Sequence, residues 1–331
     1  MKIIVYGAHD DEIPYMTQWQ ATTGHTLEIH QELLDDTTID WAAGFDGINV
    51  LQTTPYSQTM FAKMAALGIR FLTIRNVGTD NIDLAAAQAH GIRIANVPAY
   101  SPNAIAEFAV TATLHLLRRL GEVEAKLAAS DYQAATAFLG RELAQQTVGV
   151  VGAGRIGRAA IKLFHGFGAK VLAYDPHPVQ DDSLACEYVE LDELFAQADV
   201  IDLHIPGIAA NDHIIGAAEL AKMKPNALLI NTARGNLIDT QALLHALEHQ
   251  QLGGAGIDTY ERESANLLTL KETGRFEDPT WDRLRAMPNV VLTPHIAYLT
   301  ETAVQNMVEF SLNYLIEFLT VGATETEVHP R

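Results

Sequence analysis

The fold is decided by the stretch Thr147-Val148-Gly149-Val150-Val151-Gly152-Ala153-Gly154-Arg155-Ile156-Gly157. An apolar, β-branched run enters a glycine-rich turn, and a helical pattern from Arg158 to Phe167 follows at once. In such a unit Gly152 allows the tight turn, Gly154 lets the backbone approach a pyrophosphate, and Gly157 permits close packing of helix on strand. The N–H groups at the helix start would face the phosphates. The pattern predicts a dinucleotide-binding strand–turn–helix unit.

A carboxylate follows at the expected distance. A second strand, Lys170 to Tyr174, ends in Asp175, which lies 18 positions after Gly157. A carboxylate there accepts hydrogen bonds from the adenosine ribose and repels a 2′-phosphate, so the sequence favours NAD over NADP. The alternative, a glycine turn that only packs helix on sheet, leaves Asp175 unexplained.

Bulk properties narrow the class of protein. The 331 residues are enough for two domains, and 48% hydrophobic and 19% charged residues are ordinary for a folded α/β protein. The formal charge of −19 argues against nucleic-acid or anionic-membrane partners. No apolar run reaches the roughly 18 residues of a membrane span, and the first apolar run is too short for a signal peptide. We therefore expect a cytoplasmic chain.

The first hundred residues alternate strand and helix patterns, which predicts a parallel sheet. Strands are expected at 2–7, 26–30, 45–51, 71–75 and 92–95, and helices at 11–23, 57–67 and 81–90. A segment with two prolines, 96–102, is followed by a long apolar-periodic helix at 103–119.

The second part of the chain repeats the alternation around the glycine-rich turn. Near-continuous apolar strands are expected at 199–206, 227–232, 254–258 and 289–293. We expect an irregular, charge-rich insertion at 264–288, an amphipathic helix at 301–319 and a loosely held tail at 322–331. The predicted fold is α/β with two parallel-sheet domains. A Rossmann NAD-binding domain (101–297) is inserted into a smaller flavodoxin-like substrate domain (1–100 and 298–331).

Three ionisable residues lie just beyond predicted strand ends of the second domain: Arg234, Glu263 and His295. Ligands of open α/β sheets bind beyond the carboxyl ends of the strands. Taken singly, Arg234 could be a surface ion-pair residue, Glu263 part of a solvated loop and His295 a capped core histidine. Together they suit reduction of a 2-keto acid.

Each of the three has a distinct task in that chemistry. The guanidinium of Arg234 matches the substrate carboxylate and carbonyl, and it stabilises the charge that develops on the oxygen. Histidine exchanges a proton near neutral pH, which makes His295 the candidate acid. A carboxylate bonded to the other imidazole nitrogen orients the ring and favours its protonated form, and Glu263 is the candidate.

Five ordered segments resemble the D-isomer-specific 2-hydroxyacid dehydrogenase family, over nearly the whole chain. They are residues 76–81 (NVGTDN), 152–157 (GAGRIG), 231–235 (NTARG), 258–263 (DTYERE) and 293–295 (TPH). Within the family the chain looks most like D-lactate and D-2-hydroxyisocaproate dehydrogenases, and residues 45–55 and 295–298 favour the latter. The resemblance implies NAD-dependent, reversible reduction of 2-keto acids to D-2-hydroxy acids by a homodimer that pairs through the cofactor domain. The helix at 103–119 is a candidate contributor to that pairing.

The resemblance also implies roles at matching positions. Arg234 binds the substrate, His295 is the acid/base and Glu263 pairs with it. The backbone N–H groups of Val77 and Gly78 hold the substrate carboxylate, and Tyr100 and Tyr298 line the pocket, although both tyrosines could simply pack at a domain interface. The implied cofactor-binding residues are Gly152, Gly154, Arg155, Ile156, Gly157, Asp175, Pro206, Thr232, Ala233 and Asp258, with Asp258 near the nicotinamide end.

Leu51 departs from relatives specialised for lactate, which tend to carry an aromatic residue there. A leucine removes ring volume and leaves an apolar surface, so we expect a preference for 2-ketoisocaproate or phenylpyruvate over pyruvate. Burying the larger side chain could gain about 1–3 kcal/mol. Alternatively, Leu51 is a core residue at a strand end, and the chain is a D-lactate dehydrogenase that prefers pyruvate.

The remaining candidates favour ordinary roles. The seven histidines at 9, 25, 30, 204, 213, 245 and 249 show no metal-ligand pattern, so no metal requirement is expected. Cys186, the single cysteine, is expected to be a structural thiol. Related dehydrogenases of formate, glycerate or phosphoglycerate, and an NAD-sensing corepressor on the same fold, remain the alternative functions.

Overall fold

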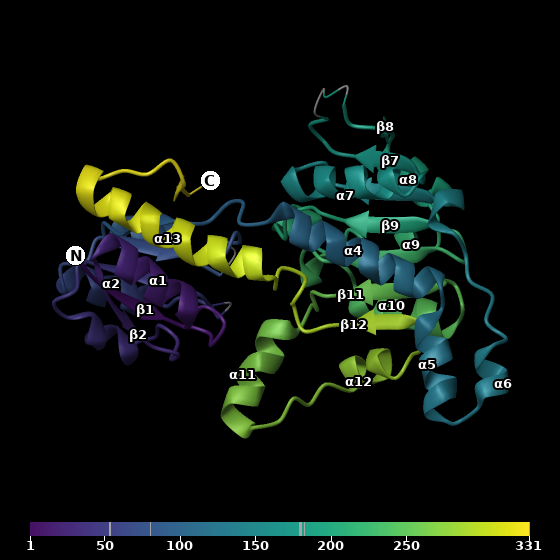
Figure 1. Cartoon of the computed structure of the whole chain (residues 1–331), viewed down its shortest axis with the longest axis horizontal. Coiled ribbons are helices and arrows are strands. Elements are labelled where there is room, and N and C mark those ends of the chain that lie inside the picture. The colour runs from purple at the N-terminus through teal and green to yellow at the C-terminus, as the bar shows by residue number, and fades with distance from the viewer. Residues whose placement is uncertain (53, 80, 179–180, 182, 331) are drawn as a thin grey trace. The chain divides into compact units, whose positions relative to one another are not determined.

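The computed structural model describes residues 1–52, 54–79, 81–178, 181 and 183–330. These divide into a first unit, Met1–Ser101 with Leu299–Arg331, and a second unit, Pro102–Tyr298. The ranges expected from the sequence differ from these by one residue at each boundary. Figure 1 shows the elements of both units. Thr53 and Asp80, which belong to the quoted segments 45–55 and 76–81, lie outside the described residues.

The first unit is built on a sheet with the strand order β13-β5-β4-β3-β1-β2. All neighbours pair in parallel except β13, which pairs antiparallel with β5. Its elements are β1 (Lys2–Tyr6), α1 (Ile13–Thr23), β2 (Thr26–Ile29), the 3₁₀ helix η1 (Thr38–Ala42), β3 (Gly47–Val50), α2 (Gln58–Ala66), β4 (Phe71–Ile74), α3 (Leu84–Ala89), β5 (Arg93–Ala95), α13 (Glu301–Val321) and β13 (Glu327–Val328). The predicted strands and helices of this unit are confirmed, with ends shifted by a few residues.

Apolar side chains cover both faces of this sheet. Alternate residues of β1 point into different clusters, Ile3 and Val5 into one and Ile4 into the other. The first cluster is closed by α1 and α13, and the second by η1, α2 and α3. Burial on two faces explains why these strands are nearly continuous apolar runs.

Residues 327–328 of the tail are paired with the first unit's sheet, so the prediction of a loosely held segment at 322–331 is wrong for this part of it. Glu327 and Val328 pair with β5, and the carboxylate of Glu327 takes two hydrogen bonds from the guanidinium of Arg93, one of them 2.7 Å from Nε to Oε1. The Arg93 guanidinium also lies over the rings of Phe71 and Phe318, at 5.9 and 5.3 Å. The tail lacks an apolar run of its own, and these partners lie more than 200 residues away in sequence.

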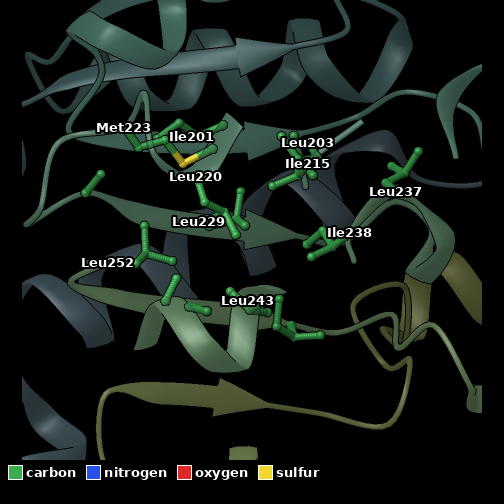
Figure 2. Packing of buried hydrophobic residues seen from close by; sticks show 14 of the residues in the cluster. Ile201, Leu203, Ile215, Leu220, Met223, Leu229, Leu237, Ile238, Leu243 and Leu252 are labelled. Carbon is green, nitrogen blue, oxygen red and sulfur yellow. The ribbon is translucent and has the colours of Figure 1, made fainter. Parts of the chain in front are cut away.

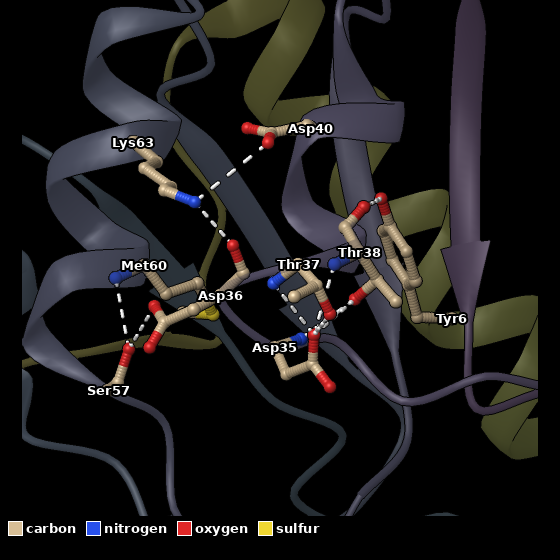
Figure 3. A network of polar contacts seen from close by, with 9 residues as sticks. All are labelled: Tyr6, Asp35, Asp36, Thr37, Thr38, Asp40, Ser57, Met60 and Lys63. Atoms are coloured by element: carbon tan, nitrogen blue, oxygen red, sulfur yellow. Dashed lines mark hydrogen bonds and ion pairs between the residues drawn. The ribbon is translucent and has the colours of Figure 1, made fainter.

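A polar network fixes the loop between β2 and η1 (Figure 3). Oδ1 of Asp35 accepts the backbone N–H groups of Thr37 and Thr38 at 2.9 and 3.0 Å. Burial acts to raise the pKa of Asp35, but the hydrogen bonds from both threonines outweigh it and lower the pKa to about 2. The same loop is joined to the end of β3, because the Leu34 N–H donates to Oε1 of Gln52 at 3.0 Å.

The second unit is built on a sheet with the strand order β12-β11-β10-β9-β6-β7-β8, in which all neighbours pair in parallel. Its elements are α4 (Pro102–Leu117), α5 (Leu120–Ala128), α6 (Tyr132–Ala135), η2 (Leu143–Gln145), β6 (Thr147–Val151), α7 (Arg155–Gly166), β7 (Lys170–Tyr174), β8 (Glu187–Tyr188), α8 (Leu191–Gln197), β9 (Val200–Leu203), η3 (Ala209–Asn211), α9 (Ala217–Leu220), β10 (Leu228–Asn231), η4 (Gly235–Leu237), α10 (Thr240–Glu248), β11 (Gly254–Ile257), α11 (Glu263–Thr273), α12 (Pro279–Arg285) and β12 (Val290–Leu292). The predicted parallel α/β fold with two sheets is confirmed.

Two apolar clusters cover the two faces of this sheet. Residues of α4 and α7, which lie against each other, form one cluster with the sheet. The other cluster takes residues from α8, α9 and α10, and Figure 2 shows Ile201, Leu203 and Leu229 of the strands packed against Leu220 and Leu243. The apolar face of α4 is therefore buried inside the second unit.

The insertion at 264–288 is helical, so the prediction of irregular structure there is wrong. Residues 263–273 form α11 and residues 279–285 form α12. Asp278 joins them, because its carboxylate accepts the hydroxyl of Tyr260 at 3.0 Å and the Asn266 amide at 2.8 Å, and it also caps α12 through Thr280 and Trp281. Burial acts to raise the pKa of Asp278, but these hydrogen bonds outweigh it and lower the pKa.

None of the helices among the described residues combines the length and the apolar character needed to cross a bilayer.

The Arg93–Glu327 contact leads to a prediction about stability. Glu327→Gln should lower the free energy of unfolding by about 1 kcal/mol at pH 7, since it removes a partly exposed bidentate ion pair. The hydrogen bond from Arg93 lowers the pKa of Glu327. The wild-type advantage is therefore complete above the pKa of the unfolded carboxyl and is lost as the pH falls through the lower, folded pKa.

Urea unfolding at pH 7 and pH 3 would measure this difference. Glu325→Gln is the matched control, because Glu325 is an exposed residue of the same tail. Equal losses of stability in the two variants would contradict the prediction.

Candidate active site

The glycine-rich turn between β6 and α7 has the geometry of a phosphate-binding loop. Gly152 has φ +99°, and a Cβ on Gly157 would lie 1.8 Å from the Gly152 carbonyl oxygen. Both positions therefore require glycine. A Cβ on Gly154, the N-cap of α7, would meet no atom within 4 Å among the described residues. The space at the helix N-terminus suits the close approach of a phosphate group. The helix begins at Arg155, three residues before the predicted start, so Arg155 and Ile156 lie in its first turn.

Two polar side chains at the carboxyl ends of strands in this sheet suit a nucleotide. Asp175 follows β7, and its carboxylate accepts the N–H of Ala153 at 2.8 Å and the N–H of His177 at 2.8 Å. A carboxylate has about four acceptor positions, so two remain for ribose hydroxyls. Thr232, at the end of β10, is buried, and its Oγ1 has no hydrogen-bond partner among the described residues. A bound cofactor would supply one, because buried hydroxyls are rarely left unpaired.

His295 and Glu263 form a direct pair. Nδ1 of His295 lies 3.1 Å from each of Oε1 and Oε2 of Glu263, and both side chains are partly exposed. Glu263 is the first residue of α11, so the helix held by Asp278 presents it. The ring of Tyr298 meets that of His295 edge to face, with centroids 6.5 Å apart. The pair leaves the second ring nitrogen, Nε2, as the atom for proton exchange with a substrate.

A buried carboxylate positions the histidine. His295 has φ +57°, a left-handed conformation that costs a non-glycine residue about 1–2 kcal/mol. Asp258, which is 2% exposed, accepts the Thr293 hydroxyl at 2.6 Å and the N–H groups of Ile296 and Ala297 at 2.9 Å each. Its carbonyl takes the N–H of His295 at 2.8 Å. The sequence did not reveal this task of Asp258, because the partners lie 35 to 39 residues away.

Arg234 lies in the turn that follows β10, next to β11 in the sheet. Its Nη1 donates to the carbonyl of Ala233 at 2.7 Å, and the side-chain amide of Asn231 donates to the carbonyl of Arg234 at 2.8 Å. A Cβ on the following residue, Gly235, would lie 2.3 Å from the backbone of Tyr260. The turn with Arg234 therefore packs on the segment that leads into Glu263. Asn231 and Gly235 support the site, and sequence reasoning did not assign them that role.

Four of the predicted substrate residues lie in the first unit, at the carboxyl end of its sheet or just beyond. Leu51 follows β3 and is half-buried, and its N–H donates to the carbonyl of Tyr6 at 3.3 Å. Val77 and Gly78 form a turn after β4. The carbonyl of Tyr100 accepts the Asn306 amide at 2.6 Å. Of the remaining cofactor candidates, Pro206 follows β9, and its carbonyl accepts the Asn211 amide at 2.9 Å.

Several histidines and the cysteine have partners that the sequence did not indicate. His30, His204 and His213 each bond a carboxylate, and Nε2 of the buried His204 lies 2.8 Å from Oδ2 of Asp202. Among the described residues, no three His, Cys, Asp or Glu side chains are grouped so that they could hold a metal ion. Burial raises the pKa of the Cys186 thiol.

Comparisons with known proteins point to one family. Residues 110–297 match the family model described as the NAD-binding domain of D-isomer-specific 2-hydroxyacid dehydrogenases. The chain is 63% identical to a D-2-hydroxyacid dehydrogenase (NAD+) of Lacticaseibacillus paracasei, covering 99% of this chain and 98% of the relative. It is 43% identical to a D-lactate dehydrogenase of Lactiplantibacillus plantarum, covering 99% of both. A solved structure of D-2-hydroxyisocaproate dehydrogenase superimposes with a TM-score of 0.95 at 62% identity, over 100% of both chains.

The glycine turn allows the site to be tested separately from the fold. Gly154→Ala should weaken NADH binding by about tenfold or more, because the new methyl group points into the space that a phosphate needs. The cost to folding should stay below about 1 kcal/mol, the usual range for an alanine at a helix N-cap. Fluorescence titration with NADH and thermal unfolding measure the two effects.

Gly166→Ala is the matched control, since a Cβ at this last residue of α7 also meets open space. Unchanged NADH affinity in Gly154→Ala would argue against the assignment of this turn to the pyrophosphate.

Proposed function

The chain belongs to the D-isomer-specific 2-hydroxyacid dehydrogenase family and is an NAD-dependent oxidoreductase, and from that premise we propose that it reduces 2-keto acids with large apolar side chains in preference to pyruvate. The observation that carries the preference is Leu51. This residue follows the buried strand β3, at the carboxyl end of the sheet, where ligands of α/β proteins bind. Its side chain is half-buried. A leucine offers an apolar surface without the volume of an aromatic ring.

The similarity to D-2-hydroxyisocaproate dehydrogenase supports the same substrate class, since that name denotes a branched, apolar side chain. The second candidate is a D-lactate dehydrogenase that prefers pyruvate, which the 43% identical relative favours. The two candidates share one reaction and differ in the volume of the pocket. Relative values of kcat/KM for 2-ketoisocaproate, phenylpyruvate and pyruvate distinguish them.

We also propose how the residues of the chain carry out the reaction. Arg234 binds the carboxylate and the carbonyl oxygen of the keto acid through its planar guanidinium. The N–H groups of Val77 and Gly78 hold the carboxylate, and Tyr100 and Tyr298 line the pocket. The bound reduced cofactor supplies the hydride that the carbonyl carbon accepts. Protonated His295 then donates its proton from Nε2 to the oxygen, while Arg234 stabilises the negative charge that grows there.

Glu263 has a supporting role in this scheme. Its carboxylate accepts a hydrogen bond from Nδ1 of His295, which keeps the ring in place and leaves Nε2 for the substrate. We assign cofactor contacts to Gly152, Gly154, Arg155, Ile156, Gly157, Asp175, Pro206, Thr232, Ala233 and Asp258. Asp258 would act at the nicotinamide end mainly by holding the loop of residues 293–297.

The proposed substrate preference can be reversed by one substitution. Leu51→Phe should lower the ratio of kcat/KM for 2-ketoisocaproate to that for pyruvate by about tenfold or more, because the ring fills the space of the larger substrate. Initial rates of NADH oxidation measure both constants.

The matched control is Leu67→Phe, the same change after α2, at the opposite end of the first unit's sheet. A wild-type enzyme that strongly prefers pyruvate would show that Leu51 does not set the specificity.

The proposed acid is tested by His295→Gln, which keeps hydrogen-bonding capacity but cannot exchange a proton. We expect kcat to fall at least about 100-fold, within the range that general acids contribute. Glu263→Gln should cause a smaller loss.

His249→Gln serves as the control, because His249 is an exposed residue at the end of α10. Turnover by His295→Gln close to that of the wild type would mean that another group supplies the proton.

We further propose that the chain forms a homodimer through the second unit. The face of α4 that was expected to contribute is buried within the unit. The segment after it is a better candidate, because α5 has no buried residue and Leu127, Tyr132 and Leu139 are exposed apolar side chains. Light scattering should give a mass of twice 36.1 kDa.

A further inference from the structure

Arg75 is the largest side chain that the described residues bury completely. Its Nε donates to Oε1 of Glu12 at 2.7 Å, and its Nη2 lies 3.2 Å from Oε2 of the same carboxylate, which is 2% exposed. Nη1 donates to Oδ1 of Asn49 at 2.6 Å, and Nη2 also donates to the carbonyls of Tyr6 and Gly7 at 3.0 Å each. One guanidinium thereby joins the carboxyl end of β1, strand β3 and the residue that precedes α1.

The Arg75 guanidinium belongs to the end of the first unit's sheet where the proposed substrate residues lie. Arg75 directly follows β4, at the carboxyl end of the parallel strands, where ligands of α/β proteins bind. The next residues are Asn76, Val77 and Gly78.

Arg75 has two connections to Leu51. Its backbone N–H donates to the carbonyl of Val50 at 2.9 Å, which fixes the residue before Leu51. Its Nη2 donates to the carbonyl of Tyr6, and the N–H of Leu51 donates to that same oxygen at 3.3 Å. A shift of the guanidinium would therefore move the strand end that carries Leu51.

The turn after Arg75 is held in an arrangement suited to an anion. The carbonyl of Val77 accepts the Asn96 amide at 2.6 Å, and the carbonyl of Gly78 accepts the Asn76 amide at 2.7 Å. Neither N–H of Val77 and Gly78 donates a hydrogen bond to another described residue. With their carbonyls engaged, these two N–H groups remain for the substrate carboxylate. Their position depends on where β4 ends, which Arg75 determines.

Stability alone does not account for a charge in this place. A buried ion pair gains little over apolar residues of the same volume, because removing both charges from water is costly. In some proteins such pairs are kept because they hold one arrangement of the chain. Here the Arg75–Glu12 pair lies between the two proposed pocket segments of the first unit, the end of β3 with Leu51 and the turn of Val77 and Gly78.

We propose that Arg75, paired with Glu12, is a positioning residue for substrate binding: it sets Leu51 relative to the N–H groups of Val77 and Gly78 and so determines the affinity for the keto acid. It does not touch the substrate, since the network encloses it completely. The inference rests on the proposed function, which places the side chain and the carboxylate of the keto acid at these residues.

The test compares Arg75→Met with the double variant Arg75→Met/Glu12→Gln in the full-length enzyme. The single change leaves a buried, unpaired carboxylate and is expected to unfold at a lower temperature. The double variant removes both charges and should recover most of that loss. In both, KM for 2-ketoisocaproate should rise roughly tenfold, because a displacement of about 1 Å in a binding group is enough for such an effect. KM for NADH should stay within twofold, since the cofactor residues lie in the second unit.

Arg93→Met is the matched control, as it removes another arginine paired with a glutamate from the same sheet. It should lower the unfolding temperature and leave KM for the keto acid unchanged. A double variant that is as stable as the wild type and has an unchanged keto-acid KM would overturn the proposal. A double variant that fails to fold would also overturn it, because the pair would then be needed for the fold itself.

The outcome separates this inference from the proposed function. If Leu51→Phe changes the substrate preference while the double variant keeps its KM, the positioning role fails and the proposed function stands. If the double variant raises KM while Leu51→Phe changes nothing, the preference for large side chains fails and the positioning role stands.

Discussion

The carboxylate of Asp258 holds the backbone that carries His295, and the proposed chemistry depends on this contact. His295 occupies a left-handed conformation, which is unfavourable for a residue with a Cβ. Three hydrogen bonds to the carboxylate and one to the Asp258 carbonyl compensate for that cost. Without them the loop would relax, and Nδ1 would no longer be 3.1 Å from Glu263. A buried acid thereby decides where His295, the proposed proton donor, lies.

Glu263 is held in a comparable way. The segment that carries it is polar and has no apolar stripe of its own. Asp278, which is almost completely buried, takes hydrogen bonds from Tyr260 before α11, from Asn266 within it and from the first turn of α12. Both partners of the His295–Glu263 pair therefore depend on buried carboxylates that are fully hydrogen-bonded, the condition under which a buried charge is tolerated.

The first unit also contains a buried charged group whose hydrogen bonds hold the chain in place, but there the group is a cation. Arg75 is a buried cation whose donors are taken by Glu12, Asn49 and two backbone carbonyls. In both units the rigid polar group lies at the carboxyl ends of parallel strands, beneath the residues proposed to meet the ligand. Residues that bind a substrate need support that keeps them within a fraction of an ångström. Packing of apolar side chains is less directional than such hydrogen bonds.

The two errors of sequence reasoning have a common cause. The segment 264–288 and the tail after Gly322 carry many charges and little apolar periodicity, which is why loops were expected. Polar contacts with residues outside each segment contribute to their order: Asp278 bonds Tyr260 in one case, and Glu327 bonds Arg93 in the other. Hydrophobic periodicity predicts which face of an element is buried against a core, and it does not predict such polar contacts.

The strands, the long helices and the glycine-rich turn with Asp175 could be read from the sequence by itself, because each depends on residues close together in the chain. The same holds for the choice of Arg234, Glu263 and His295, since each follows a recognisable strand. Only the tertiary structure decided what holds these groups in place: Asp258 with residues 293–297, Asp278 with two helices, and Arg75 with a carboxylate 63 positions away. A hydrogen bond depends on distance and direction in space, and a linear pattern of residue types contains neither until the chain has folded.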